Sequence, residues 1–146
     1  MQKIIVKVIL ELGFSQTAHS REIRNYFQRG MKLCEKHLGE MGKKLAQAHL
    51  PTPKSYQGEV THSTEAPFSD KLMLFHLVSI VEVAAGYYGA ALSATQRKDL
   101  VLMYSKMIAE IALYAEDGIN LLIKNGWLEE PPTAADRQAL DEKMDN

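Results

Sequence analysis

The fold is decided by residues 95–132, which read TQRKDLVLMYSKMIAEIALYAEDGINLLIKNGWLEEPP. Their apolar side chains recur every three or four positions and therefore lie on one face of an α-helix. Ser93 or Thr95 can cap its first turn. Asn125-Gly126 offers a left-handed exit, after which Pro131-Pro132 prevents continuation. The predicted helix is about 40 Å long, and its partners must match this length. Its apolar face consists of Leu100, Met103, Met107, Ile111, Tyr114, Gly118, Leu121 and Leu122.

Composition indicates one ordinary globular domain. The 146 residues can bury one sizeable core, and 46% apolar with 24% charged residues is typical of globular proteins. The net charge of −1 provides no basic field, so we expect no nucleic acid partner and no anionic lipid surface. Cys34 is the only cysteine, which excludes a disulfide within the chain and favours a reducing, cytoplasmic compartment.

The N-terminal segment MQKIIVKVILELGF has the basic start and apolar run of a signal peptide, but Lys7 and Glu11 interrupt the run. Their spacing places both on one helix face together with Lys3, opposite an apolar face. We predict a short amphipathic helix over about residues 2–12 that breaks at Gly13. No stretch approaches the length of a transmembrane helix, so we expect no membrane span. The apolar face consists of Ile5, Val8, Ile9 and Leu12.

A second helix follows, which Ser15, Thr17 or Ser20 can cap. It ends before Pro51, because the residue preceding a proline is pushed out of the helical region. Residues 51–68, PTPKSYQGEVTHSTEAPF, contain three prolines and a glycine, which favour a long crossover loop. The inward side chains of this helix are predicted to be Ile23, Phe27, Met31, Cys34, Leu38, Met41 and Leu45.

Ser69-Asp70 caps a third helix over about residues 70–92. Four helices with one long connection after the second match the ferritin-like variant of the four-helix bundle, and no segment alternates with the period of a strand. We therefore predict an all-α, ferritin-like up-down four-helix bundle over residues 1–132 with a shortened first helix, followed by a polar tail at 133–146. The inward side chains of the third helix are predicted to be Leu74, Leu77, Val78, Val81, Ala85, Tyr88 and Leu92.

Ferritin-like bundles can hold two iron ions through inward Glu and Glu-x-x-His ligands. The only such motif here, Glu59–His62, lies in the predicted loop. We therefore expect no metal site, no cofactor and no stoichiometric iron in protein purified without added metal. If a polar core site exists, its candidates are His37, His76, Glu82 and Glu110. Facing helices could bring Glu82 and Glu110 together, which would raise the pKa of one carboxylate.

The sequence gives little support to other kinds of catalytic or binding site. The sequence contains no strand–turn–helix nucleophile elbow, no Gly-rich phosphate loop and no Walker motif, which favours a non-enzymatic protein without deciding the question. Cys34 and His37 are spaced for a soft-metal pair, but a buried thiol beside a boundary histidine is the simpler interpretation. Trp127 and Tyr87-Tyr88 are interpreted as core packing, with a binding groove at the end of the bundle as the alternative.

Three motifs in the last two helices carry a family resemblance. They are YGAALS at 88–93, RKDL at 97–100, and LLIKNGW at 121–127 followed by Pro131-Pro132. Together they resemble the domain-of-unknown-function family 3231, whose members come from spore-forming bacteria and are often labelled spore-coat-like. The resemblance covers most of residues 17–132 and implies a ferritin-like bundle. It implies no established activity and no catalytic residues, and the first helix here is shorter than the family's.

Two functions follow as hypotheses. The first is a non-enzymatic structural or interaction protein made in sporulating cells, located in the cytoplasm or the spore coat, with coat proteins as partners. The second is a small-molecule- or metal-binding bundle centred on His37, His76, Glu82 and Glu110.

Unequal helix lengths also predict a homodimer. The last three helices span about 35–48 Å, whereas the first covers about 17 Å. Half of one groove along the bundle should therefore lack its fourth wall and expose apolar side chains. A two-fold dimer, in which each chain covers the gap of the other, is the simplest remedy.

Overall fold

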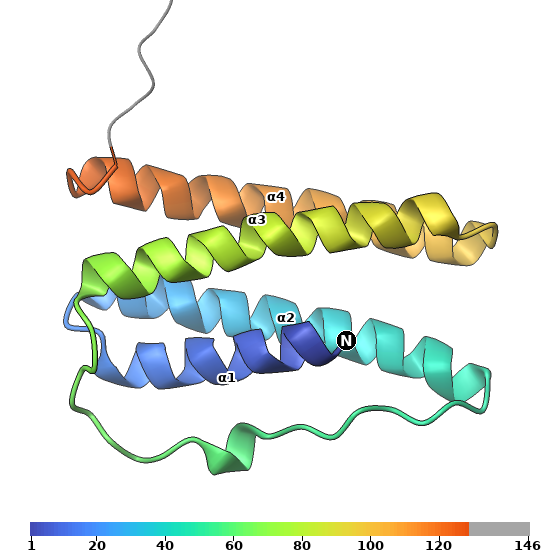
Figure 1. Ribbon diagram of the computed structural model, residues 1–146, viewed down its shortest axis with the longest axis horizontal. Helices are drawn as coiled ribbons and strands as arrows, with labels where there is room; N and C mark the ends of the chain where they lie inside the picture. The colour runs from blue at the N-terminus through green and yellow to red at the C-terminus, as the bar shows by residue number, and fades with distance from the viewer. Residues whose placement is uncertain (129–146) are drawn as a thin grey trace, which may run out of the picture.

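Four α-helices make up the part of the chain that the structure, a computed structural model, describes, namely residues 1–128 (Figure 1). The predicted all-α four-helix fold is confirmed, and no strand occurs in these residues. The predicted tail at 133–146 and the Pro131-Pro132 stop lie outside them. The helices are α1 (Gln2–Thr17), α2 (Arg21–Gln47), α3 (Asp70–Ala94) and α4 (Lys98–Lys124), with a short 3-10 helix, η1 (Gln57–Glu59), between α2 and α3.

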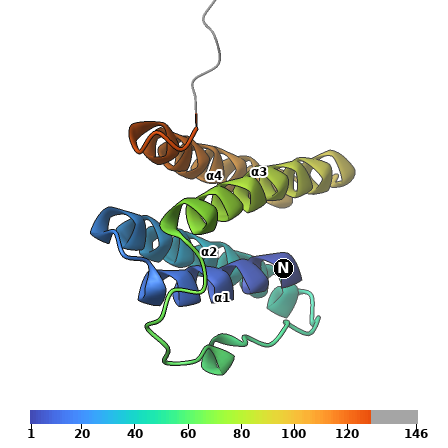
Figure 2. The same ribbon diagram turned by 60° about the vertical axis from the view of Figure 1, so that its left-hand side comes forward.

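The helices form two hairpins. α1 packs mainly on α2, and α3 packs mainly on α4, with far fewer contacts between the two pairs. The hairpins lie on each other as two layers (Figure 2). The predicted long connection after α2 is present and carries the chain back along the molecule, so α2 and α3 run in the same direction (Figure 1). A closer relation to ferritin-like bundles stays a prediction.

The first helix is longer than predicted. It does not break at Gly13 but continues to Thr17, whose hydroxyl donates a hydrogen bond to the Gly13 carbonyl at 3.1 Å. The extra turn buries Phe14 against Phe27, with ring centroids 5.8 Å apart. This burial outweighs the modest helix penalty of glycine. With 16 residues, about 24 Å, α1 is still shorter than the other three helices, which have 25 to 27.

The predicted polar face of α1 is wrong. Lys7 is 5% exposed and Glu11 is fully buried, whereas Val6 is exposed. The reason is that α1 contacts both α2 and α3, so its two sides are covered and its solvent face is narrow. The helix is thus turned by about one position relative to the prediction, since successive residues lie about 100° apart.

The core of the other helices largely follows the predicted faces. α4 buries Met107, Ile111, Tyr114, Gly118 and Leu122, all of which were predicted to face inward. On α2 the buried face is displaced, because Tyr26, Gly30 and His37 are buried while Met31, Leu38 and Leu45 are only partly covered. The residues with 2% exposure or less are Val8, Ala18, Ile23, Phe27, Met73, Leu74, Leu77, Val81, Met107 and Leu122, together with Glu11 and His37.

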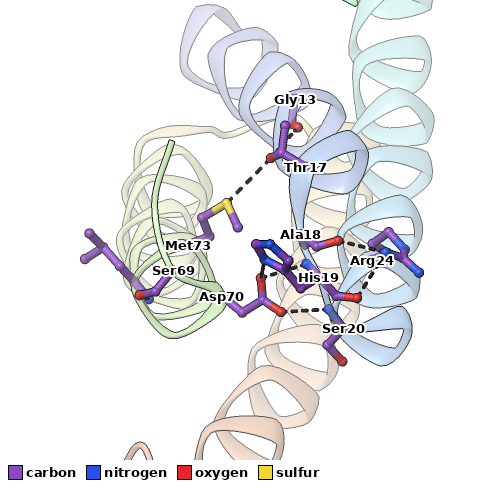
Figure 3. A network of polar contacts seen from close by, with 10 residues as sticks. Gly13, Thr17, Ala18, His19, Ser20, Arg24, Ser69, Asp70 and Met73 are labelled. Atoms are coloured by element: carbon purple, nitrogen blue, oxygen red, sulfur yellow. Dashed lines mark hydrogen bonds and ion pairs between the residues drawn. The ribbon is translucent and has the colours of Figure 1, made fainter. Parts of the chain in front are cut away.

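Asp70 joins the start of α3 to the start of α2. Its carboxylate accepts hydrogen bonds from the backbone N–H groups of His19 (2.9 Å) and Ser20 (2.8 Å), as Figure 3 shows. Ser20 is the N-cap residue of α2, and its hydroxyl makes no capping bond. Asp70 bonds the two residues just before the helix and so holds the start of α2 against the start of α3. Ser69 caps α3 as predicted, accepting a hydrogen bond from Leu72 N at 3.3 Å.

The start of α4 differs from the prediction, whereas its end agrees with it. Neither Ser93 nor Thr95 caps it, because α3 continues to Ala94 and α4 begins at Lys98. Its exit is as predicted. Gly126 has a φ of +66°, and the backbone N–H of Trp127 donates to the Leu122 carbonyl at 2.8 Å. Trp127 is partly buried against the core.

α3 is apolar on more than its core face. By length and composition alone it is long and apolar enough to cross a membrane, so the expectation that no stretch approaches that length is wrong for this helix. Core helices of soluble bundles share this property. Only 33% of its apolar window is buried, and Leu72, Phe75 and Val83 are about half exposed in the described part of the chain.

Candidate functional site

The structure brings together two of the four candidate polar residues. His37 on α2 and Glu110 on α4 lie 2.9 Å apart, from Nε2 to Oε2. His76 and Glu82 are both exposed on α3. Glu110 pairs with α2, through His37 and through Lys36 Nζ at 2.6 Å, so the suggested convergence of Glu110 with Glu82 is not what the structure shows.

His37 is 1% exposed and bonded through both ring nitrogens. Its Nδ1 lies 3.1 Å from the Tyr88 hydroxyl. Burial lowers the pKa of His37, and the opposing effect of its hydrogen bond to Glu110 is smaller. Burial also raises the pKa of Tyr88, which keeps its hydroxyl protonated. We therefore assign a neutral imidazole that donates from Nε2 to Glu110 and accepts at Nδ1 from Tyr88.

Glu110 is the charged end of this chain of bonds. Partial burial acts to raise its pKa, but hydrogen bonds from Lys36 and then His37 outweigh it, so the net shift is downward. The carboxylate is therefore ionised at neutral pH, while the histidine beside it is not. This arrangement orients the His37 ring and leaves the Tyr88 oxygen with a free acceptor lone pair.

A second polar cluster was not found from the sequence. Lys7 Nζ lies 2.6 Å from Glu11 Oε1 and 3.3 Å from Cys34 Sγ, all of them buried. The Tyr114 hydroxyl also donates to Glu11 Oε1, at 3.1 Å. Burial raises the pKa of Glu11, against the influence of Lys7. Glu11 Oε2 has no hydrogen-bond partner within the described residues. The one available signal was that both charges interrupt an apolar run.

Two tyrosines and two glycines build the wall of this cluster. Tyr26 and Tyr114 stack with ring centroids 4.3 Å apart and planes 5° from parallel. A Cβ at Gly30 would collide with the Glu11 carboxylate and the Tyr114 hydroxyl. A Cβ at Gly118 would collide with the Tyr26 hydroxyl and come within 2.6 Å of a Val78 methyl. Both glycines are therefore required by close packing of side chains.

Cys34 is a buried thiol and not a reactive one. Burial raises its pKa to about 12, so it stays protonated at neutral pH. Cys34 and His37 lie on the same helix, but the soft-metal pair is not completed by a third ligand. Among residues 1–128, no group of three or more His, Cys, Asp or Glu side chains is placed to hold a metal ion.

A groove opens between the two hairpins, beside the N-terminal half of α1. We call it the hairpin groove; its volume is about 760 Å³, within the range of roughly 300–1,000 Å³ typical of ligand pockets. The sequence predicted a gap along half of one groove of the bundle but did not say which half. Most of the lining of the hairpin groove is apolar, and its polar floor comes from the two clusters described above, through Lys7, Cys34, His37 and Tyr88.

The charged side chains that line the hairpin groove are of one sign. Lys7 lies at its floor, and Lys3 lies at its rim with Nζ 3.3 Å from the centroid of the Tyr87 ring. Among the described residues no Asp or Glu lines it, although Glu11 lies behind Lys7. His76 also lines it, so two of the four candidate residues, His37 and His76, reach the same groove.

These observations define a four-helix protein with an apolar groove and, within residues 1–128, no metal-binding cluster. Residues 1–140 match the family described as "Protein of unknown function (DUF3231)", and the chain belongs to that family. The fold is similar to that of a "putative spore coat protein" from Bacillus halodurans C-125, with a TM-score of 0.77 and 14% identity, over 92% of this chain and 90% of the other. No curated protein matches the chain.

Proposed function

We propose that this chain is a non-enzymatic structural protein of the spore coat that self-associates as a homodimer through the outer face of α3. The proposal is supported by membership of a family without an assigned activity and by the similarity to the Bacillus halodurans structure. The observation that carries it is a row of half-exposed apolar side chains on α3: Leu72 (51%), Phe75 (48%) and Val83 (56%).

The outer face of α3, defined by these three residues, suits a second helix. Phe68, just before the helix, extends the apolar surface at its N-terminal end. Towards the C-terminal end, Cβ atoms added at Gly86 and Gly89 would meet nothing within 4 Å. Large side chains at one end and small ones at the other are complementary when two copies pack antiparallel about a two-fold axis. Burying such a face removes an apolar patch from water.

Light scattering tests the dimer. The wild type is expected at twice the 16.4 kDa chain mass at micromolar concentration. Replacing Leu72→Gln and Phe75→Gln together should give the monomer mass. The matched control is Leu102→Gln with Leu113→Gln, which removes two exposed leucines from α4 instead and should leave the dimer intact. A wild-type monomer, or equal masses for both double variants, would contradict the proposal.

The coat assignment needs a separate experiment in the sporulating host. An epitope-tagged chain is expected to be absent from growing cells and to appear in the extracted coat fraction of purified spores. The Leu72→Gln, Phe75→Gln variant should be lost from that fraction, because an assembled layer needs the contact. Equal amounts in growing cells and none in the coat extract would refute a coat role and leave the dimer untouched.

The hypothesis of a metal-binding bundle finds only one short contact among its four candidate residues, that of His37 with Glu110. A small-molecule-binding bundle finds more support, since the hairpin groove has the size and lining of a ligand site.

A further inference from the structure

We propose that the hairpin groove binds an amphiphile with an apolar body and a single carboxylate head, of the fatty-acid class, with the head at Lys7. This inference does not depend on the coat or on the dimer contacts of Leu72 and Phe75, although Val83 belongs to both surfaces. It joins three properties of the groove: its apolar walls, its polar floor and the sign of its charges.

The walls select an apolar body. They come from all four helices, through side chains such as Val6 of α1, Met41 of α2, Ile80 and Val83 of α3, and Ile111 of α4. Half-exposed Val6 and Val83 at the rim would be covered by a bound chain and removed from water. An apolar molecule that fills the groove supplies the contacts that the short first helix leaves unmade.

The floor selects the head. An ammonium has three N–H donors, and the structure assigns two of those of Lys7, to Glu11 Oε1 and Cys34 Sγ. A ligand oxygen can take the third. Tyr88 offers no donor to a carboxylate, because its hydrogen is directed to His37 Nδ1, so Lys7 is the group that would hold the head. A carboxylate bonded to Lys7 gains a charge-assisted hydrogen bond to a side chain that is only 5% exposed.

The charges discriminate between heads of different sign. Lys3 at the rim and Lys7 at the floor favour an anion over a cation, and the nearest carboxylate, Glu11, is already bonded to Lys7 and to Tyr114. His37 is neutral and adds no repulsion for either sign. A phosphate-rich ligand fits less well, since the groove has no Gly-rich loop and few donors.

Isothermal titration calorimetry with dodecanoate, dodecanol and dodecylamine, each below its micellar concentration, tests the proposal. Dodecanoate is expected to bind one molecule per chain, about tenfold or more tightly than either analogue, because only it makes the charge-assisted bond. Equal affinity for the three, or no binding of dodecanoate, would overturn the proposal. A second arm uses vesicles of phosphatidylglycerol or phosphatidylcholine. Binding to vesicles without binding of free dodecanoate would assign the surface to a membrane instead.

Two variants separate head from body. Lys7→Met with Glu11→Leu replaces the ion pair by apolar side chains, which avoids leaving a buried charge unpaired. It should reduce dodecanoate affinity to that of dodecanol and leave dodecanol unchanged. Ala84→Phe fills the groove and should abolish binding of both. Lys32→Met, which removes an exposed lysine of α2 outside the groove, is the charge control and should bind like the wild type. Loss of affinity in Lys32→Met equal to that in the double variant would refute a role for Lys7.

The dimer and the ligand can fail separately. Leu72 and Phe75 do not line the hairpin groove, so their double variant should bind dodecanoate with wild-type affinity even as a monomer. If this variant loses dodecanoate binding, the ligand site is not contained within one chain and the proposal is wrong as stated.

Discussion

The Tyr26 hydroxyl on α2 donates a hydrogen bond to the Tyr114 carbonyl on α4 at 3.1 Å, while the two rings stack. The Tyr114 hydroxyl lies 3.1 Å from both the Tyr26 carbonyl and Glu11 Oε1, which share its single hydrogen. This pair and the bonds of His37 to Tyr88 and Glu110 are polar links between the two hairpins. The same packing places the Tyr114 hydroxyl beside the Glu11 carboxylate of α1. Both tyrosines were visible in the sequence, but their pairing depends on a register between α2 and α4 that periodicity does not specify.

Removing the Tyr114 hydroxyl should destabilise the protein. Tyr114→Phe removes the one hydrogen that Glu11 Oε1 and the Tyr26 carbonyl share, and Glu11 Oε2 already has no partner within the described residues. We expect a loss of about 2 kcal/mol in the free energy of unfolding, measured by urea titration. Tyr56→Phe, on the exposed crossover loop, is the control and should change it by less than about 0.5 kcal/mol. Equal effects of the two variants would contradict this account.

Two glycines of α2 should respond oppositely to alanine. Gly30→Ala drives a methyl group into Glu11 and Tyr114, and we expect a loss of about 2 kcal/mol or more from overpacking. Gly39 has open space around it, so Gly39→Ala should gain up to about 1 kcal/mol from helix propensity. Thermal unfolding of both variants checks the prediction, which is wrong if Gly30→Ala is as stable as Gly39→Ala.

Acid should weaken the contribution of His37. Its pKa is lowered on folding from the ordinary 6.5, so below about pH 6.5 the unfolded chain binds more protons than the folded one. The stabilisation is therefore complete above pH 6.5 and is lost as the pH falls towards the folded pKa. Glu11, whose pKa is raised from 4.5, acts with the opposite sign above pH 4.5, so the wild-type curve alone is ambiguous.

The informative quantity is the difference in unfolding free energy between the wild type and His37→Asn. It should shrink as the pH is lowered from about 7.5 to about 5, because the variant lacks the titrating group. A difference that is constant over this range would show that His37 keeps its ordinary pKa in the folded protein.

The exit of α4 provides a test of backbone conformation. Gly126 has a φ of +66°, which a β-branched residue tolerates poorly. Gly126→Val should lose about 1 kcal/mol or more, whereas Gly126→Asn should lose less, because asparagine adopts the left-handed region more readily. Chemical denaturation distinguishes them. Equal losses would mean that the side chain, and not the sign of φ, is what matters at this position.

The fold followed from periodicity because α4 and α3 each bury one regular face, and Ser69 and Gly126 mark their limits as expected. The candidate site was predicted only in part. His37 and Glu110 were identified as polar residues beside apolar faces, but His76 and Glu82 carried the same signal and are exposed. Only the packing of α2 on α4 separates the two cases.

Lys7 and Glu11 show a second reason why the candidate site could not be fully predicted from the sequence. Charged side chains are placed outside by default, since their burial requires a partner and a cavity of matching shape. Here the space comes from Gly30 and the partner bond from Tyr114, both on other helices. No pattern within residues 1–14 could have indicated either of them.

The hydrogen bonds from the N–H groups of His19 and Ser20 to the Asp70 carboxylate join the two hairpins at one corner of the molecule. The hairpin groove lies towards the opposite end, lined by the N-terminal half of α1 and by α3 beyond His76. There the bonds of His37 to Tyr88 and Glu110 join the hairpins a second time, so any widening of the groove acts against them. A ligand of the groove therefore has to match the width at which these bonds hold the two hairpins.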